Sequence, residues 1–455
     1  MNDILIKNTK VFYKNQLQPG EVLIDEGKIK KIAKNLKGED ADRHIDAHGG
    51  LTIPAGIDVH VHFREPGMTH KEDWYSGSCA AAAGGIGTVV EHPNTLPPVL
   101  DRKSFREKFK LANRKSIIDF GINGGVGKNI EKLETLWELG VTSFGEIFMA
   151  ESTAGLGLDS ELLKEALETI QQLGALACIH AEDENIKCDN ENLLKKDFTP
   201  QSHSRIRSNQ CEAMAVKNAL ELSGLTSVNT HFCHISTLEA FGQLKREKYI
   251  LEKEDVSRHL SFEVAPHHLF LSDHDWERLG TFGKMNPPLR NRQSVKALIN
   301  GINDGTVDVV ASDHAPHRES EKEGDIKSAP SGVPGVETLM PLMMVGAKRN
   351  LFPLKRLIEV TSSNPARIFG LDNHGKGVFA EGYDADLIVM DPGNVKSINS
   401  DMLHSKAGWT PYEGMEGIFP EYTISRGEII WDGDIVGRRG RGNFLPGAGS
   451  VKDED

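Results

Sequence analysis

Eight short apolar segments, each followed by a stretch with helical spacing, constrain the fold of this 455-residue chain more than any other feature. They are residues 56–61, 87–91, 116–122, 141–149, 175–180, 228–234, 260–265 and 307–312. Parallel strands buried on both faces appear in a sequence as continuous apolar runs, and their crossover connections are usually helices. The pattern therefore predicts an α/β fold with a (β/α)8 barrel of the TIM type over residues 53–375.

The two ends of the chain have a different pattern. Short strand-like runs separated by Gly and Asp turns occupy residues 3–8, 21–25 and 28–33 near the start, and 385–390, 421–425 and 428–431 near the end. Such spacing is typical of antiparallel strands. We expect residues 1–52 and 376–455 to form the two parts of one small β-sandwich domain beside the barrel. Residues 447–455 are expected to be frayed.

Composition excludes several classes of function. The net charge of −13 argues against a nucleic-acid partner, which selects a basic surface. No run of about 18 apolar residues is present, so no membrane-spanning helix is expected. Residues 1–10 lack the features of a signal peptide, and the five cysteines include no C-x-x-C pair. These features predict a cytoplasmic protein with reduced thiols.

Two histidines at the end of the first barrel strand are the strongest chemical signal. His60 and His62 are two residues apart, so in a strand their imidazoles point to the same side. Active sites of TIM barrels lie at the C-terminal ends of the strands. A single histidine there is usually a surface or core residue, whereas this pair predicts a metal site.

Later strands end in further candidate ligands: His180, His234 and Asp313. Each alone is as consistent with a helix-capping or loop residue as with a metal ligand. Together with the first pair they supply four imidazoles and a carboxylate at one end of the barrel. This set of donors suits zinc, whereas magnesium or calcium favours oxygen ligands.

Several motifs give the chain a family resemblance. They are Asp-Val-His-Val-His-Phe-Arg at 58–64, Pro-Asn-Thr at 93–95, Lys-Met-Asn-Pro-Pro-Leu-Arg at 284–290, Asp-His-Ala-Pro-His at 313–317 and Gly-Tyr-Asp-Ala-Asp-Leu at 382–387. In this combination they resemble the metal-dependent amidohydrolase superfamily, and within it the dihydroorotases. The resemblance extends from about residue 45 to residue 437.

The resemblance implies a site with two zinc ions. One ion is expected on His60, His62 and Asp313, and the other on His180 and His234. Residues expected to bind the substrate, chiefly through its carboxylate, are Arg64, Asn94, Asn286 and His317. A guanidinium offers a planar pair of donors that matches a carboxylate, which makes Arg64 chemically suitable.

One expected ligand is replaced. Dihydroorotases usually carry a carboxylated lysine on the fourth strand, whereas the equivalent segment 143–149 has Glu146 and no lysine lies between Lys132 and Lys164. A carboxylate, like a carbamate, offers two oxygens and one negative charge. Glu146 is therefore expected to bridge two metals, and the alternative is that it forms a salt bridge beside a single metal.

The implied reaction is the reversible cyclisation of N-carbamoyl-L-aspartate to L-dihydroorotate in pyrimidine biosynthesis. Water activated by metal would attack the ring amide, with Asp313 as general acid and base. Alternatives are an allantoinase, a dihydropyrimidinase (hydantoinase), or a non-catalytic dihydroorotase-like scaffold subunit. A homodimer is also compatible with the resemblance. Residues 328–335 either cover the substrate or form an ordinary Gly- and Pro-rich turn.

Overall fold

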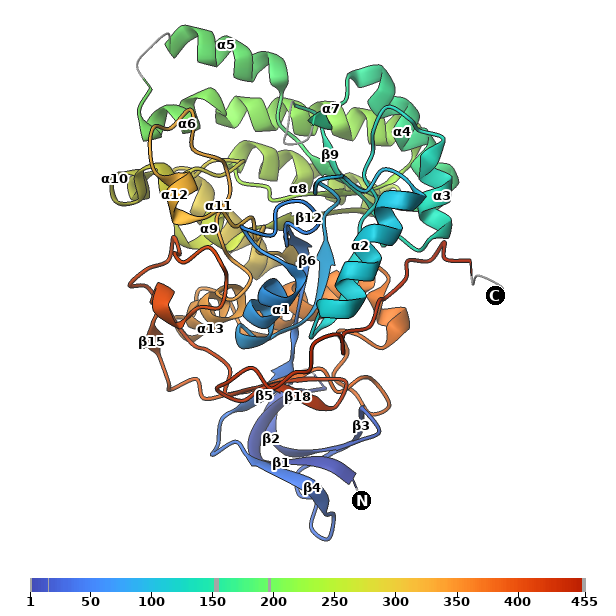
Figure 1. Ribbon diagram of the computed structural model, residues 1–455, viewed down its shortest axis with the longest axis vertical. Helices are drawn as coiled ribbons and strands as arrows, with labels where there is room; N and C mark the ends of the chain where they lie inside the picture. The colour runs from blue at the N-terminus through green and yellow to red at the C-terminus, as the bar shows by residue number, and fades with distance from the viewer. Residues whose placement is uncertain (1, 15, 151–154, 195–197, 452–455) are drawn as a thin grey trace.

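A parallel barrel forms the larger part of the protein, and a β-rich part lies at one end of it (Figure 1). The structure is a computed structural model that describes residues 2–14, 16–150, 155–194 and 198–451. Among these residues, no helix is both long and apolar enough to cross a bilayer.

Eight parallel strands form the barrel in two hydrogen-bonded groups. The first contains β6 (Gly56–Val61), β7 (Ile86–Glu91) and β8 (Asp119–Ile122), and the second contains β9 (Phe144–Phe148), β10 (Leu176–His180), β11 (Asn229–Phe232), β12 (Leu260–Val264) and β13 (Val309–Val310). Single parallel bridges between Gly124 and Phe144 and between Val61 and His314 join the groups into a ring. The predicted barrel is confirmed, although several strands are shorter than expected.

Helices follow the strands and cover the outside of the barrel (Figure 1). They are α1 (Trp74–Ala83), α2 (Arg102–Lys115), α3 (Lys132–Glu138), α4 (Ser160–Gln172), α5 (Glu184–Leu194), α6 (Pro200–Ile206), α7 (Asn209–Thr226), α8 (Leu238–Lys253), α9 (Pro266–Phe270), α10 (Trp276–Leu279), α11 (Arg292–Asp304), α12 (Glu319–Lys322), α13 (Leu339–Lys348), α14 (Leu354–Ile358) and α15 (Asn364–Ile368).

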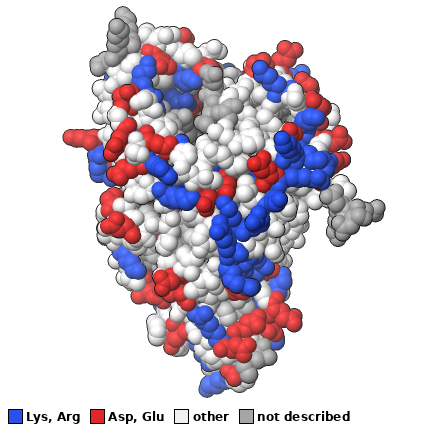
Figure 2. All heavy atoms as spheres, in the orientation of Figure 1, with Lys and Arg blue, Asp and Glu red and all other residues white. Residues whose placement is uncertain are grey.

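Local sequence explains where these helices begin and which side they bury. In α2, the Asp101 side chain accepts a hydrogen bond from the amide of Ser104, which caps the helix start. Phe105, Lys108 and Ala112 repeat at helical spacing and are buried against the barrel. The opposite side is rich in lysine and arginine, and Figure 2 shows basic side chains gathered over this helix, with acidic ones around them.

Strands from both chain ends share one eight-stranded sheet. Its members are β1 (Asn2–Tyr13), β2 (Gln16–Asp25), β3 (Lys28–Ala33), β4 (Ala41–Asp46), β5 (Leu51–Pro54), β14 (Leu387–Met390), β17 (Tyr422–Ser425) and β18 (Glu428–Trp431). A separate two-stranded pair is formed by β15 (Lys396–Ser397) and β16 (Glu416–Gly417). Antiparallel pairing of β5 with β14 joins the N-terminal and C-terminal segments, and β5 leads into β6 after one residue.

A buried lysine joins this sheet to the barrel. Lys376 is 1% exposed, and its ammonium group contacts three carboxylates. They belong to Asp119 on β8 and to Asp384 and Asp386, the last two at 2.9 Å. Because a lysine buried without carboxylates would be costly, this cluster holds the two parts together.

The C-terminal stretch differs from the expectation that residues 447–455 are frayed. Gly447 donates to the carbonyl of Gly140, and Val451 donates to that of Glu138. A side chain at Gly447 would meet the Val141 carbonyl oxygen at 2.0 Å, so the absence of one lets the chain lie close to the barrel. Residues 452–455 lie outside the described residues.

Candidate metal centre and substrate pocket

The predicted metal ligands meet at the C-terminal ends of the barrel strands. His60 lies in β6, Glu146 in β9 and His180 at the end of β10, whereas His234 and Asp313 follow β11 and β13. His234 and Asp313 have left-handed φ angles of 31° and 47°. Such angles are unfavourable for residues with side chains and concentrate at functional sites, where the surrounding structure maintains them.

The ligand atoms form two adjacent groups. His60, His62 and Asp313 make one group, in which the Asp313 carboxylate lies 3.5 Å and 3.4 Å from Nε2 of the two histidines. Glu146, His180 and His234 make the other. Within each group the potential ligand atoms lie within 4.8 Å of one another, which is close enough to hold one metal ion.

Glu146 lies between the two groups. Its Oε1 is 3.0 Å from both Nδ1 of His180 and Nε2 of His234, and its Oε2 is 3.7 Å from Nε2 of His62. Burial raises the pKa of Glu146, but the charge of His60 and hydrogen bonds from His180 and His234 bring it well below the usual range. An ionised carboxylate in this position faces both groups, as a bridging ligand must.

The orientation of His60 fits a metal ligand. Its Nδ1 is 2.5 Å from Oε1 of Glu263, whereas its Nε2 is buried without a hydrogen-bond partner among the described residues. Metal-binding histidines commonly donate the other ring N–H to a carboxylate, which fixes the tautomer. The free nitrogen therefore faces the place where a metal would bind.

The carboxylates that orient these histidines were not predicted from the sequence. Glu263 on β12 contacts His60. Glu182 lies 2.9 Å from Nε2 of His180 and also forms an ion pair with Arg207. For Glu263 the sequence did hold a signal, because it is a glutamate inside the apolar run 260–264. An unpaired carboxylate there would be costly, so a buried partner could have been expected. His92 was also missed; it follows β7 and groups with His60 and Glu146.

Asp313 is ionised in this environment. Burial raises the pKa of its carboxyl group, but a hydrogen bond from His62 and the nearby imidazoles of His60 and His234 lower it to about 2. The group is therefore a proton acceptor at neutral pH.

Residues predicted to bind substrate line a cavity of about 80 Å³ next to the two groups. Arg64 is 5% exposed there and donates from Nε to the carbonyl of Pro316, but it forms no ion pair with the described residues. Asn94 accepts a hydrogen bond from Nδ1 of His62 at 2.7 Å. Asn286 accepts one from His203 at 3.0 Å, so the amide N–H groups of both asparagines remain available as donors.

His317 adjoins the cavity from the side of Arg64. Lys71 donates to its Nδ1 at 3.0 Å, so the ring proton is on Nε2, 3.0 Å from the carbonyl of Ser331. Burial, with the charges of Arg64 and Lys71, lowers the pKa of His317 far below its usual value. His317 is thus a neutral donor beside a guanidinium.

The loop containing residues 328–335 forms part of the cavity wall through Ser331 and Gly332. Lys322 is fully buried and donates to the carbonyls of Lys284, Pro330 and Gly332 at 2.8, 2.9 and 3.0 Å. These bonds use all three donors of the ammonium group, so the loop is fixed in place over the site.

A barrel with histidines and carboxylates gathered at its strand ends belongs to a class of hydrolases. The sequence profile of the Amidohydrolase family matches residues 51–430, and the chain belongs to that family. Within it, the relatives of this chain include proteins named dihydroorotase. That of Methanosarcina acetivorans is 61% identical over 100% of this chain and 98% of its own length. That of Halobacterium salinarum is 40% identical over 91% of this chain and 94% of its own length.

Solved structures show the same architecture. L-hydantoinase (dihydropyrimidinase) from Arthrobacter aurescens has a TM-score of 0.93 at 27% identity, covering 98% of this chain and 100% of that one. Dihydropyrimidinase from Brevibacillus agri has a TM-score of 0.90 at 26% identity, covering 99% and 100%. The predicted family resemblance is confirmed.

Proposed function

We propose that the protein is a zinc-dependent dihydroorotase that interconverts N-carbamoyl-L-aspartate and L-dihydroorotate in pyrimidine biosynthesis. The observation that carries this proposal is Arg64. Its guanidinium is buried beside the metal ligands and has no carboxylate partner in the described chain. A buried charge without a partner is costly, so a carboxylate on the substrate is the natural counterpart.

The substrate carboxylate would be held chiefly by Arg64 and Asn94. Arg64 supplies paired N–H groups and Asn94 supplies amide N–H groups, whereas His317 would donate to the substrate only by exchanging its Nε2 hydrogen bond to the Ser331 carbonyl for one to the carboxylate. This arrangement would place the ring amide next to Asp313. L-dihydroorotate carries such a carboxylate, whereas the dihydropyrimidine and hydantoin rings do not require one.

Six residues would hold two zinc ions: His60, His62 and Asp313 on one side, His180 and His234 on the other, and Glu146 between them. When bound, zinc polarises a carbonyl and lowers the pKa of water toward about 7. Support for the bridging role comes from the position of Glu146 within 3.7 Å of nitrogens in both groups.

Asp313 would move the proton in both directions. In hydrolysis it takes a proton from the attacking water and gives it to the ring nitrogen as the C–N bond breaks, which forms N-carbamoyl-L-aspartate. In synthesis it takes that proton from the carbamoyl nitrogen and returns it as water leaves. No redox partner is needed, because one water molecule is consumed or released.

The test is turnover of L-dihydroorotate by the zinc-loaded protein, followed by the loss of ultraviolet absorbance of the ring amide. Dihydrouracil, which is L-dihydroorotate without its carboxylate, is the matched control. We expect turnover of L-dihydroorotate with little turnover of dihydrouracil. Preferential turnover of dihydrouracil or allantoin would support the alternative activities, and no turnover with an empty metal site would support a scaffold.

We further propose a cytoplasmic protein that acts on a small molecule and not on nucleic acid, in keeping with the net charge of −13. A homodimer remains a proposal from the family resemblance, which light scattering of the purified protein would test.

A further inference from the structure

A second cavity lies at the opposite end of the barrel from the metal ligands. It has a volume of about 720 Å³, within the range of small-molecule sites. The residues that line it include Thr142, Leu176, Asn229 and Leu260, which precede or begin β9, β10, β11 and β12. The cavity is therefore at the N-terminal ends of the strands, whereas Glu146 and His180 lie at their C-terminal ends.

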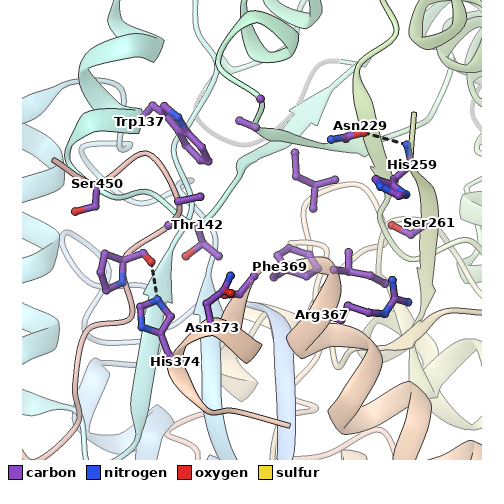
Figure 3. A pocket seen from close by; sticks show the side chains of 18 of the residues that line it. Trp137, Thr142, Asn229, His259, Ser261, Arg367, Phe369, Asn373, His374 and Ser450 are labelled. Carbon is purple, nitrogen blue, oxygen red and sulfur yellow. Dashed lines mark hydrogen bonds between the residues drawn. The ribbon is translucent and has the colours of Figure 1, made fainter. Parts of the chain in front are cut away.

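The cavity wall is largely apolar and contains a few polar groups. Trp137 lies on one side of it, Arg367 on another, and Phe369 between them in Figure 3. The Arg367 guanidinium forms no hydrogen bond or ion pair with any residue in the described ranges. Thr142 is 5% exposed, and its hydroxyl group has no hydrogen-bond partner in that same part of the chain.

Among the described residues, Asp308 is the one carboxylate in the wall, and it is already neutralised. Both oxygens of Asp308 accept hydrogen bonds from Lys248 at 2.7 Å, and one of them also accepts from the amide of Phe262. In the described part of the chain, the charge in the wall that no carboxylate pairs is therefore that of Arg367, whose side chain is exposed. Charge complementarity selects a negatively charged ligand, and the aromatic and aliphatic wall selects an apolar body.

We infer that this cavity is a second ligand site, which binds an organic anion with a flat apolar body. The anionic group would pair with Arg367, and the body would contact Trp137 and Phe369.

A buried chain of hydrogen bonds connects this cavity to the metal centre. Ser261, which lines the cavity, lies 2.8 Å from Nδ1 of His231, and Nε2 of His231 lies 3.1 Å from Glu263. Glu263 in turn holds His60. Because the Glu263 carboxylate only accepts, His231 donates to it from Nε2 and Ser261 donates to Nδ1 of His231. A ligand that repositions Ser261 therefore has a physical route to His60.

The binding test uses the zinc-loaded full-length protein and two fluorescent probes with nearly the same apolar body. 8-Anilinonaphthalene-1-sulfonate carries the anionic group, and N-phenyl-1-naphthylamine is neutral. We expect Arg367→Gln to weaken binding of the sulfonate about 10-fold or more, as for loss of a hydrogen bond to a charged group, and to leave the neutral probe unchanged. Ala448→Trp, which fills the cavity from its wall, should abolish binding of both probes.

Arg246→Gln is the matched control, because Arg246 is exposed on α8 and does not line the cavity. Thermal unfolding of each variant checks that it is folded. Sulfonate binding by Arg367→Gln that equals that of the unaltered protein would overturn the charge argument. Binding of both probes by a folded Ala448→Trp variant would overturn the site itself.

The route to His60 is tested by L-dihydroorotate turnover with and without saturating sulfonate probe. This second test rests on the proposed function, whereas probe binding does not, so the two can fail separately. We expect the probe to alter kcat or KM, and this effect to disappear in Ser261→Ala. No effect on the unaltered protein, or the same effect in Ser261→Ala, would overturn the route.

Discussion

Glu263 lies 2.5 Å from Nδ1 of His60, and this contact determines which nitrogen of the ring faces the candidate metal site. Burial raises the pKa of Glu263, but the charge of His60 and the hydrogen bonds from His231 and His60 hold it well below its usual value. The Glu263 carboxylate is therefore ionised and can only accept hydrogen bonds. The orientation of His60 thus depends on a residue 203 positions away in the sequence.

Glu263→Gln should weaken zinc binding while the six proposed ligands stay in place. Loss of an outer carboxylate typically lowers metal affinity by about 10–100-fold, because the ligand tautomer is no longer fixed. Competition with a chromophoric chelator measures the affinity. Glu252→Gln on the exposed side of α8 is the matched control. Equal zinc affinity in the two variants would contradict the orienting role of Glu263.

Glu146→Gln should remove a ligand and not merely an orienting group. We expect at most one zinc per subunit and an activity loss greater than the roughly 100-fold typical of outer residues. Elemental analysis of the purified variant measures the zinc content. Glu146→Asp, which keeps the carboxylate, should retain more zinc than Glu146→Gln. Two tightly bound zinc ions in Glu146→Gln would rule out the bridge.

Lys376→Met should destabilise the fold without affecting the site directly. The substitution leaves the carboxylates of Asp119, Asp384 and Asp386 buried near one another without their shared lysine. Breaking a buried ion pair from one side typically costs about 3–5 kcal/mol of unfolding free energy. Chemical denaturation measures the loss, with the exposed Lys396→Met as control. A loss no larger than that of the control would contradict the joining role of Lys376.

His404 should make stability depend on pH. Its Nδ1 donates to Glu337 at 2.8 Å, and this hydrogen bond raises the pKa of His404 above 6.5. A raised folded-state pKa stabilises the protein below about pH 6.5, and this contribution is lost as the pH rises through the folded-state pKa. Because the side chain is partly exposed, the effect should be below about 1 kcal/mol.

The measurement for His404 is the difference in unfolding free energy between the unaltered protein and His404→Gln at two pH values. The difference should be larger at pH 6 than at pH 9, since only the charged imidazole gains from Glu337. A difference that is constant, or that grows with pH, would show that the ion pair does not contribute.

The barrel was predictable because buried parallel strands have a strong sequence signature. The details at the strand ends were not. The predicted strand 307–312 forms a ladder only at Val309–Val310, and the predicted strand 228–234 ends at Phe232. In both cases the chain turns to place a site residue, Asp313 or His234, in a left-handed conformation. Tertiary geometry overrides local strand preference at these positions.

The candidate ligands could be found from sequence because each follows an apolar run, so strand order alone brings them to one end of the barrel. Their supporting residues could not, apart from Glu263, which is marked as a glutamate inside an apolar run. Glu182, Glu263 and Lys322 act through contacts that depend on side-chain directions across neighbouring strands and loops. No local pattern encodes such contacts, and the pairing of β5 with β14 is long-range in the same way.

Arg64→Gln gives the most direct test of the central claim, that the site selects a substrate carboxylate. The quantity to measure is kcat/KM for L-dihydroorotate and for dihydrouracil in the zinc-loaded protein. We predict that the substitution raises KM for L-dihydroorotate by about 100-fold, as expected for a buried charged hydrogen bond, with zinc content unchanged. The preference over dihydrouracil should then largely disappear. An unchanged preference between the two substrates in Arg64→Gln would contradict the account.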